Sequence, residues 1–409
     1  MDRLGARRGG PHRLRNSFLS YAIVARPMQT GLYLHIPFCR HRCSYCDFNT
    51  YVGLNDLYEP YTQALAREIV ARACGQRPSA HTIFFGGGTP SLLSADQLGH
   101  LIQTCHDAFD MQPGAETTIE CNPGTVTLDS LRALRAVGAN RLSFGAQSAD
   151  PAELTLLGRE HGWAEVTTAI DLARAAGFDN VSLDLIFGLP HQGLETWRRT
   201  LDAALALAPD HISLYALTIE AGTPLQDLTR RGTLPLPDPD AAADMYDHAE
   251  ARMGEAGYAH YEISNWSRPG RACAHNLIYW RNEPYYGLGA GAHSSSIDRR
   301  WWNARRPADY IERANQSDEA IRAGAVEQSH EDIDARMSRG ETMMLGMRLL
   351  QEGMTHARFE ARYGAPMTTF FADALADGQA RGLVTVDADG ARLTEKGRFL
   401  SNHVFRMFV

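Results

Sequence analysis

The sequence has almost no lysine: Lys396 is the only one in 409 residues, which excludes Schiff-base chemistry in the main body of the chain. It contains no run of about eighteen apolar residues, so no transmembrane segment is expected. The net charge is −8, so a nucleic-acid-binding role has no electrostatic support. The glycine run at 86–90 lacks both the Gly-Lys-Ser/Thr of a phosphate loop and the G-x-G-x-x-G spacing, so phosphate binding is not indicated.

Cysteine is also scarce, and the seven cysteines are an odd number, which argues against a disulfide framework. Three of them, Cys39, Cys43 and Cys46, stand at C-x3-C-x2-C spacing on a predicted loop after a strand. This is a metal pattern typical of a reducing compartment, and it predicts a cytoplasmic protein. Cys74, Cys105 and Cys121 fall in helical or strand patterns and are expected to be buried.

Two chemistries suit three clustered thiolates. Zinc would take four ligands, with His41 or a distant residue as the fourth. A 4Fe-4S cluster would bind one thiolate per iron and leave its fourth iron open to a further ligand.

Strand and helix patterns alternate after the cysteine loop, which indicates successive βαβ units and a parallel sheet. With the strand before the loop there are six units, so the predicted fold is α/β, a partial (β/α)6 barrel like an incomplete TIM barrel. The predicted strands are 31–36, 81–85, 117–121, 140–145, 181–187 and 211–217. The predicted helices are 57–73, 95–108, 127–137, 163–176 and 194–207.

Polar side chains occur at or near the carboxyl ends of these strands: Glu120, Gln147, Arg159 and Asp184. A single one of them would be explained by a helix cap, and Arg159 by an ordinary salt bridge. Four in succession favour one shared site, because the carboxyl ends of barrel strands lie together.

The cysteine loop ending in Phe48 resembles the signature of the radical S-adenosylmethionine (SAM) superfamily. Together with the glycine run and the strand-end residues, it is similar to the oxygen-independent coproporphyrinogen III oxidase group. The resemblance implies that the three cysteines hold a 4Fe-4S cluster whose open iron binds SAM. It also implies nine SAM-binding residues, of which the last four flank a second site: Tyr33, Gly87, Gly88, Thr89, Glu120, Tyr45, Gln147, Arg159 and Asp184.

The segment His275-Asn-Leu-Ile-Tyr-Trp280 resembles the HemW-type haem chaperones within that group. This resemblance implies a protein that binds haem and passes it to an acceptor protein. His275 is then a candidate haem contact, although a histidine among aromatic residues also fits a hydrogen-bonded core position. His293, which follows a glycine-rich run, could equally face the site. Covalent haem attachment is unsupported, because Cys273 and His275 do not form a C-x2-C-H motif.

Two further functions stay open. One is a SAM-dependent radical enzyme of the coproporphyrinogen III oxidase type, which would need a reductant. The oxidases carry a further cysteine two residues after the third, and Phe48 stands there, which counts against oxidase activity and leaves catalytic residues unassigned. The other is a zinc protein with a DNA-binding wing, which conflicts with the polar residues on successive strands.

We expect four parts along the chain. Residues 1–27 are an arginine-rich extension, explained by disorder, an early start codon or a transit peptide. Residues 28–230 form the barrel, and 231–334 form a middle extension with a helical linker after 307. Residues 335–409 give a winged-helix-like pattern of helices and a two-stranded wing. This last part lacks a basic patch, so packing or partner docking is favoured over DNA binding.

Overall fold

The structure is a computed structural model that describes residues 28–409. The predicted extension at 1–27 lies outside the described residues. Within them, no helix is both long and apolar enough to cross a membrane.

Six parallel strands form the centre of a twelve-stranded sheet, in the order in which they occur in the chain. The prediction of a partial (β/α)6 barrel is therefore confirmed. The strands are β1 (Gly31–Ile36), β4 (Ser79–Gly87), β5 (Asp110–Cys121), β6 (Arg141–Gln147), β7 (Val181–Phe187) and β8 (His211–Ala216).

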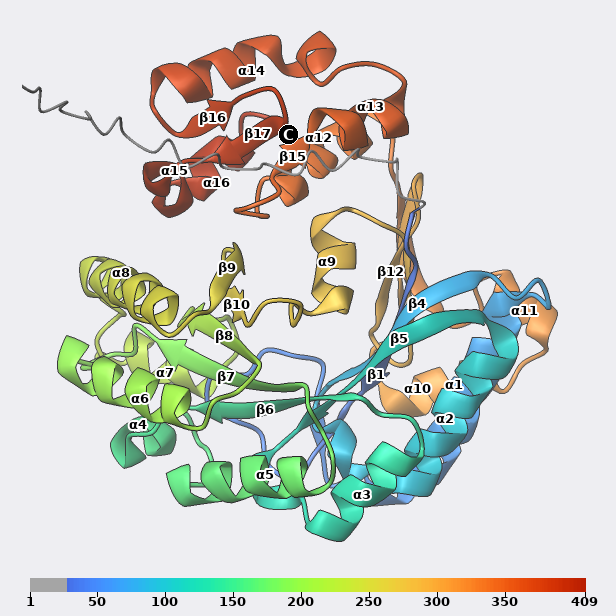
Figure 1. The fold of residues 1–409 in the computed structure, drawn as a ribbon. Helices are drawn as coiled ribbons and strands as arrows, with labels where there is room; N and C mark the ends of the chain where they lie inside the picture. The colour runs from blue at the N-terminus through green and yellow to red at the C-terminus, as the bar shows by residue number, and fades with distance from the viewer. Residues whose placement is uncertain (1–27) are drawn as a thin grey trace, which may run out of the picture.

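Helices follow the strands and cover the outer face of the curved sheet (Figure 1). Their apolar sides and the strands enclose one large core in which Leu34, Phe85 and Leu183 are fully buried. The helices are α1 (Tyr58–Ala73), α2 (Ala95–Ala108), α3 (Leu128–Ala136), α4 (Pro151–Leu156), α5 (Trp163–Ala175) and α6 (Leu194–Ala206).

The register of the strands brings their carboxyl ends level. Ile36 pairs with Gly87, Glu120 with Ser143, and Gly145 with Asp184. Polar residues from strands that lie far apart in the sequence therefore meet at one end of the barrel.

Further strands extend the sheet at both edges. Beyond β8 lie β10 (Asn265–Ser267) and β9 (Ala259–Glu262), with α7 (Pro224–Arg230) and α8 (Pro239–Glu255) nearby. Beyond β1 lie β11 (Tyr285–Leu288), β12 (His293–Ser295), β13 (Arg299–Asn303) and β14 (Glu327–Asp332).

The linker predicted after residue 307 is only partly right. It contains two short helices, α10 (Pro307–Ala314) and α11 (Asp318–Arg322), but it ends in the edge strand β14. The sequence of β14, Glu-Gln-Ser-His-Glu-Asp, is polar on both faces and almost wholly exposed. An exposed edge strand needs no apolar alternation, so the pattern gave no sign of it.

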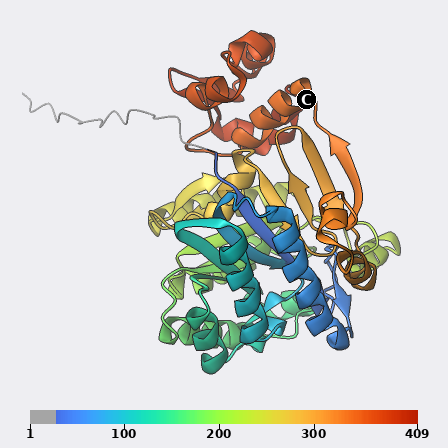
Figure 2. The same cartoon turned by 90° about the vertical axis from the view of Figure 1, so that its right-hand side faces the viewer.

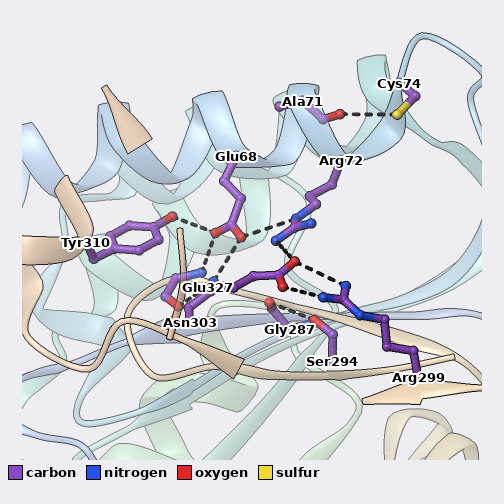
Figure 3. A network of polar contacts seen from close by, with 11 residues as sticks. Glu68, Ala71, Arg72, Cys74, Gly287, Ser294, Arg299, Asn303, Tyr310 and Glu327 are labelled. Carbon is purple, nitrogen blue, oxygen red and sulfur yellow. Dashed lines mark hydrogen bonds and ion pairs between the residues drawn. The ribbon is translucent and has the colours of Figure 1, made fainter. Parts of the chain in front are cut away.

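A buried polar network fastens this edge of the sheet to helix α1 (Figure 3). Glu68 is fully buried and accepts hydrogen bonds from the Tyr310 hydroxyl at 2.7 Å, the Asn303 amide at 2.9 Å and the Gly289 N–H at 2.8 Å. Arg72 lies 3.6 Å from Glu68 and 3.1 Å from Glu327. Since a buried carboxylate is tolerated only with such partners, the network fixes residues 289–327 against α1.

The C-terminal part lies on one side of the barrel in both views (Figures 1 and 2). It has its own core, with Met343, Phe359 and Val384 buried, and a sheet in the order β15-β17-β16. Helices and a two-stranded wing give the winged-helix-like fold. Its elements are α12 (Ala335–Gly346), β15 (Met354–Thr355), α13 (His356–Tyr363), α14 (Thr368–Ala380), β16 (Val384–Val386), β17 (Gly390–Leu393), α15 (Glu395–Phe399) and α16 (Ser401–Phe405).

Candidate functional site

The cysteine loop is held at both ends and in its middle. Its ends are the short paired strands β2 (Phe38–Cys39) and β3 (Tyr51–Val52). In its middle, the Ser44 hydroxyl donates to the Leu156 carbonyl at 2.5 Å and the Ser44 N–H to the Leu157 carbonyl at 3.1 Å. The loop is therefore fastened across the barrel opening to the C-terminal end of α4.

The three cysteines of this loop line one cavity of about 430 Å³ at the carboxyl ends of the strands. Burial above all raises the pKa of the Cys39 thiol to about 11; the Thr89 hydroxyl opposes this shift, and the nearby Cys46 and Cys43 thiols add to it. Arg159 donates to the Cys43 sulfur at 3.3 Å. The thiols therefore lie close enough to influence one another and have polar partners beside them.

The donor set suits a 4Fe-4S cluster. Among residues 28–409, no group of three or more His, Cys, Asp or Glu side chains is arranged around one point as the ligands of a single metal ion are. A cube of four irons keeps its thiolates further apart than one ion does, and three thiolates facing one cavity suit it.

The glycine run packs directly against the cysteine loop. The Gly88 N–H donates to the Ile36 carbonyl at 2.9 Å, and the Thr89 N–H donates to the Phe38 carbonyl at 2.8 Å. A side chain on Gly88 would place its Cβ 2.5 Å from the Phe38 carbonyl oxygen and 3.0 Å from the Cys39 sulfur. Gly87 has φ of 114° and faces the His35 ring. The close approach of these two chain segments thus requires glycine.

The polar residues at the strand ends converge on the same cavity. Glu120 accepts from the Gly87 N–H at 3.1 Å, and Asp184 accepts from the Ser143 hydroxyl at 3.3 Å. Arg159 donates to the Gly145 carbonyl at 2.8 Å. Gln147 has the left-handed φ of 69° at a bulge where β6 slips against β7. Such backbone strain is tolerated where the surroundings fix it, and it often marks a functional site.

The two carboxyl groups at the strand ends are reluctant to ionise. Burial above all raises the pKa of Glu120 to about 8, and the nearby Asp184 adds to this, whereas the Gly87 N–H and Arg141 oppose it. Burial also raises the pKa of Asp184, against hydrogen bonds and the Arg141 and Arg159 charges. Shifted acids in a cavity are a feature of binding sites for cations and polar ligands.

The structure brings eleven of the thirteen predicted site residues to this one cavity. The other two lie deeper. Tyr33 and His275 line a neighbouring cavity of about 220 Å³ inside the barrel, which Glu120 and Asp184 also line. The eleven are Cys39, Cys43, Cys46, Tyr45, Gly87, Gly88, Thr89, Glu120, Gln147, Arg159 and Asp184.

His275 is buried, in helix α9 (Ala274–Trp280), and both of its ring nitrogens have hydrogen-bond partners. Nδ1 lies 2.7 Å from the Thr82 hydroxyl, near the start of β4, and Nε2 lies 2.9 Å from the Tyr279 hydroxyl. This arrangement fits the hydrogen-bonded core position that the sequence left open. An iron ligand needs a free nitrogen, so haem ligation by His275 stays a prediction that requires one of these bonds to break.

Other lining residues escaped the sequence analysis, among them Ser143 and Tyr215. Tyr215 could have been found, because it lies near the end of the predicted strand 211–217. The expectation that Cys74 is buried was wrong: it is exposed, at the end of α1, where the chain turns with φ of 53°. Cys105 and Cys121 are buried as expected.

Comparisons with known proteins agree with this geometry. A model of the radical SAM superfamily matches residues 33–204, and a model of the HemN C-terminal domain matches residues 338–400. The chain is 39% identical over 387 residues to the heme chaperone HemW of Mycobacterium tuberculosis, covering 93% of this chain and 94% of that protein. It is 36% identical over 379 residues to the heme chaperone HemW of Bacillus subtilis, covering 92% and 98%.

A solved structure shares the fold over most of the chain. It is the coproporphyrinogen III oxidase (HemN) from Escherichia coli, described as a radical SAM enzyme, with a TM-score of 0.77 and 26% sequence identity. The match covers 93% of this chain and 90% of that one.

Proposed function

This chain belongs to the HemW family of haem chaperones within the radical SAM superfamily, and from that premise we propose that it binds haem and transfers it to an acceptor protein. In this proposal it also holds a 4Fe-4S cluster and SAM. The observation that carries the proposal is the similarity to haem chaperones over nearly the whole chain, together with three cysteines facing one cavity.

We propose that Cys39, Cys43 and Cys46 each bind one iron and that the fourth iron is left for SAM, which exchanges. A cluster of this kind supplies an electron to the sulfonium of SAM when it is reduced. The Arg159 contact with the Cys43 sulfur supports a negatively charged cluster at this place.

The proposed roles of the other residues follow from their chemistry. Glu120 has one hydrogen-bond donor and faces the cavity, so it can accept from the SAM ammonium or from ribose hydroxyls. Asp184 can accept from ribose hydroxyls, and Arg159 can pair with a carboxylate. Gly87, Gly88 and Thr89 present backbone groups beside the cluster loop. Tyr45 and Gln147 line the same cavity, and Tyr33 lines the two cavities that adjoin it.

The second candidate is a radical enzyme of the coproporphyrinogen III oxidase type, which the fold of the E. coli oxidase favours. Phe48 argues against it. This residue stands where the oxidases carry their further cysteine, and its side chain is 63% exposed in the cavity.

We further propose that residues 335–409 act as a packing or docking module, which their separate core supports. The haem acceptor would be a protein of the same compartment. The clustered free thiols support a reducing compartment, and hence the cytoplasm.

An anaerobic comparison of two reactions tests the proposal. Purified protein with an intact cluster is titrated with haem and, separately, incubated with coproporphyrinogen III, SAM and a reductant. Saturable haem binding without turnover of coproporphyrinogen III supports the chaperone. Turnover selects the oxidase, and failure to bind haem refutes the chaperone.

A further inference from the structure

A second cavity of about 610 Å³ adjoins the cavity of the cysteine loop. Phe48, Gly87 and Glu120 line both, so the two cavities meet at the end of the cysteine loop. The wall on the far side comes from β11, β12 and β13 and the turns between them. A volume of this size falls in the range of sites for drug-sized and cofactor-sized ligands.

Aromatic side chains dominate the walls of this second cavity. Tyr279, Tyr285 and Trp302 line it, and Phe48 lines both this cavity and that of the cysteine loop. The Phe48 ring is 63% exposed. A flat apolar ligand in the cavity would cover this ring and would contact the others.

His293 is the histidine of this region with available ring nitrogens. Its ring stacks on Trp302, with 5.5 Å between the ring centroids and 21° between the planes. Within residues 28–409 neither nitrogen of His293 has a hydrogen-bond partner. By contrast, His35, which also lines the cavity, lies 2.9 Å from the Tyr33 hydroxyl and 3.0 Å from the Asn49 carbonyl, and both nitrogens of His275 are taken.

A cationic group without a counter-charge stands beside the same cavity. The exposed guanidinium of Arg305 makes no ion pair with any carboxylate of the described part of the chain, whereas Arg300 pairs with Glu331 and Glu341. The Arg305 carbonyl accepts from Asn49 at 2.9 Å and from Tyr51 at 3.3 Å, which fixes this residue beside the cysteine loop.

From these contacts we propose that haem binds in the second cavity, with His293 as an axial ligand of its iron and Arg305 paired with a propionate. The proposal rests on the haem-binding function proposed above and assigns it a place. A flat macrocycle with a metal at its centre and carboxylates at its edge needs ring surfaces, one nitrogen donor and a cation, and this cavity offers all three.

The placement also explains two features of the chain. Phe48, in place of a further cysteine, covers one face of the macrocycle beside the cluster loop. The exposed position of His293 leaves the haem near the surface, where an acceptor protein can reach it. His275, engaged with Tyr279, holds one aromatic wall of the cavity in position.

A titration of ferric haem into the full chain, with the cluster intact, tests the proposal. His293→Gly is compared with wild type and with a matched control, His330→Gly. His330 is an exposed histidine of the same sheet, on strand β14, which is separated from the strand of His293 by β13. We expect His293→Gly to lose the Soret and spin-state signature of a nitrogen-ligated iron and to bind haem about tenfold more weakly. Added imidazole should restore the signature in this variant. His330→Gly should match wild type.

Arg305→Ala gives an independent arm of the test. It should weaken binding of haem about tenfold but leave binding of haem dimethyl ester unchanged, because the ester has no propionate charge. If Arg305→Ala binds haem and haem dimethyl ester each as tightly as wild type does, Arg305 does not pair with a propionate.

The outcomes separate this inference from the function on which it rests. If wild type binds haem and His293→Gly keeps both its spectrum and its affinity, the site assigned here is wrong and the chaperone function stands. The same holds if His275→Ala loses the signature while His293→Gly keeps it. If wild type with an intact cluster binds no haem, the chaperone function itself is refuted.

Discussion

Two acidic side chains, Glu68 on helix α1 and Glu120 at the end of strand β5, have opposite characters. Glu68 has three hydrogen-bond donors and an arginine around it, all supplied by the chain itself. Glu120 has one N–H donor, and its pKa is raised to about 8 because burial outweighs that single bond. A carboxylate that completes its contacts within the protein holds the fold together, whereas one that leaves them incomplete is prepared for a ligand.

The largest effect on stability is expected in the hydrogen-bond network of Glu68. Glu68→Ala should lower the free energy of unfolding by about 3 to 5 kcal/mol, because the buried Tyr310 hydroxyl and the Gly289 N–H lose their acceptor and Arg72 loses one of its two carboxylates. Chemical denaturation of the apoprotein measures this. If Glu68→Ala lowered the free energy of unfolding no more than a substitution on the surface does, Glu68 would not stabilise the fold.

A methyl group added to the glycine run should displace the cysteine loop and should not affect the hydrogen-bond network of Glu68. Gly88→Ala places a Cβ 2.5 Å from the Phe38 carbonyl oxygen, so the cysteine loop must shift. We expect a cost of about 1 to 3 kcal/mol and an iron content well below that of wild type. Gly193→Ala, which meets no atom within 4 Å, is the matched control. Equal iron content in the two variants would contradict the close packing proposed for the cluster loop.

Glu120→Gln should weaken the binding of SAM, in contrast to Glu68→Ala, which should lower the stability of the fold. At pH 4.5, where Glu120 is protonated in the folded apoprotein, the fold keeps its stability to within about 1 kcal/mol. SAM binds to the cluster-loaded protein about tenfold more weakly, because the amide cannot ionise to the carboxylate that the SAM ammonium favours. Equilibrium binding of SAM under anaerobic conditions measures the loss. Unchanged affinity would place the SAM ammonium and ribose elsewhere.

A further effect is expected from pH. The pKa of Glu120 is raised from its ordinary value of 4.5 to about 8 in the folded apoprotein, so the folded state holds a proton that the unfolded chain releases between these values. Glu120 therefore destabilises the apoprotein increasingly as pH rises through this window. The difference in melting temperature between Glu120→Gln and wild type should grow from pH 4.5 to pH 8. A constant difference would mean that Glu120 ionises normally.

The sequence predicted the barrel because alternating strand and helix patterns are local signals. The six strands and five helices expected from them are present, and most site residues follow from the cysteine spacing and the positions of strand ends. The second cavity itself was beyond such reasoning. The sequence offered His293 as a residue that could face the site, but Trp302 and Arg305 reach the cavity only because β11 pairs in parallel with β1, placing Tyr285 beside Gly31. The polar strand β14 and the left-handed backbone of Gln147 likewise depend on tertiary contacts.

The central claim is that three cysteines hold a cluster with one iron open to SAM, within reach of Glu120. Electron paramagnetic resonance of the anaerobically reduced protein, recorded with and without SAM, tests it most directly. The account predicts a 4Fe-4S signal that shifts when SAM is added in wild type and is absent in Cys39→Ala. A signal that SAM leaves unchanged in wild type, or that survives in Cys39→Ala, would contradict it.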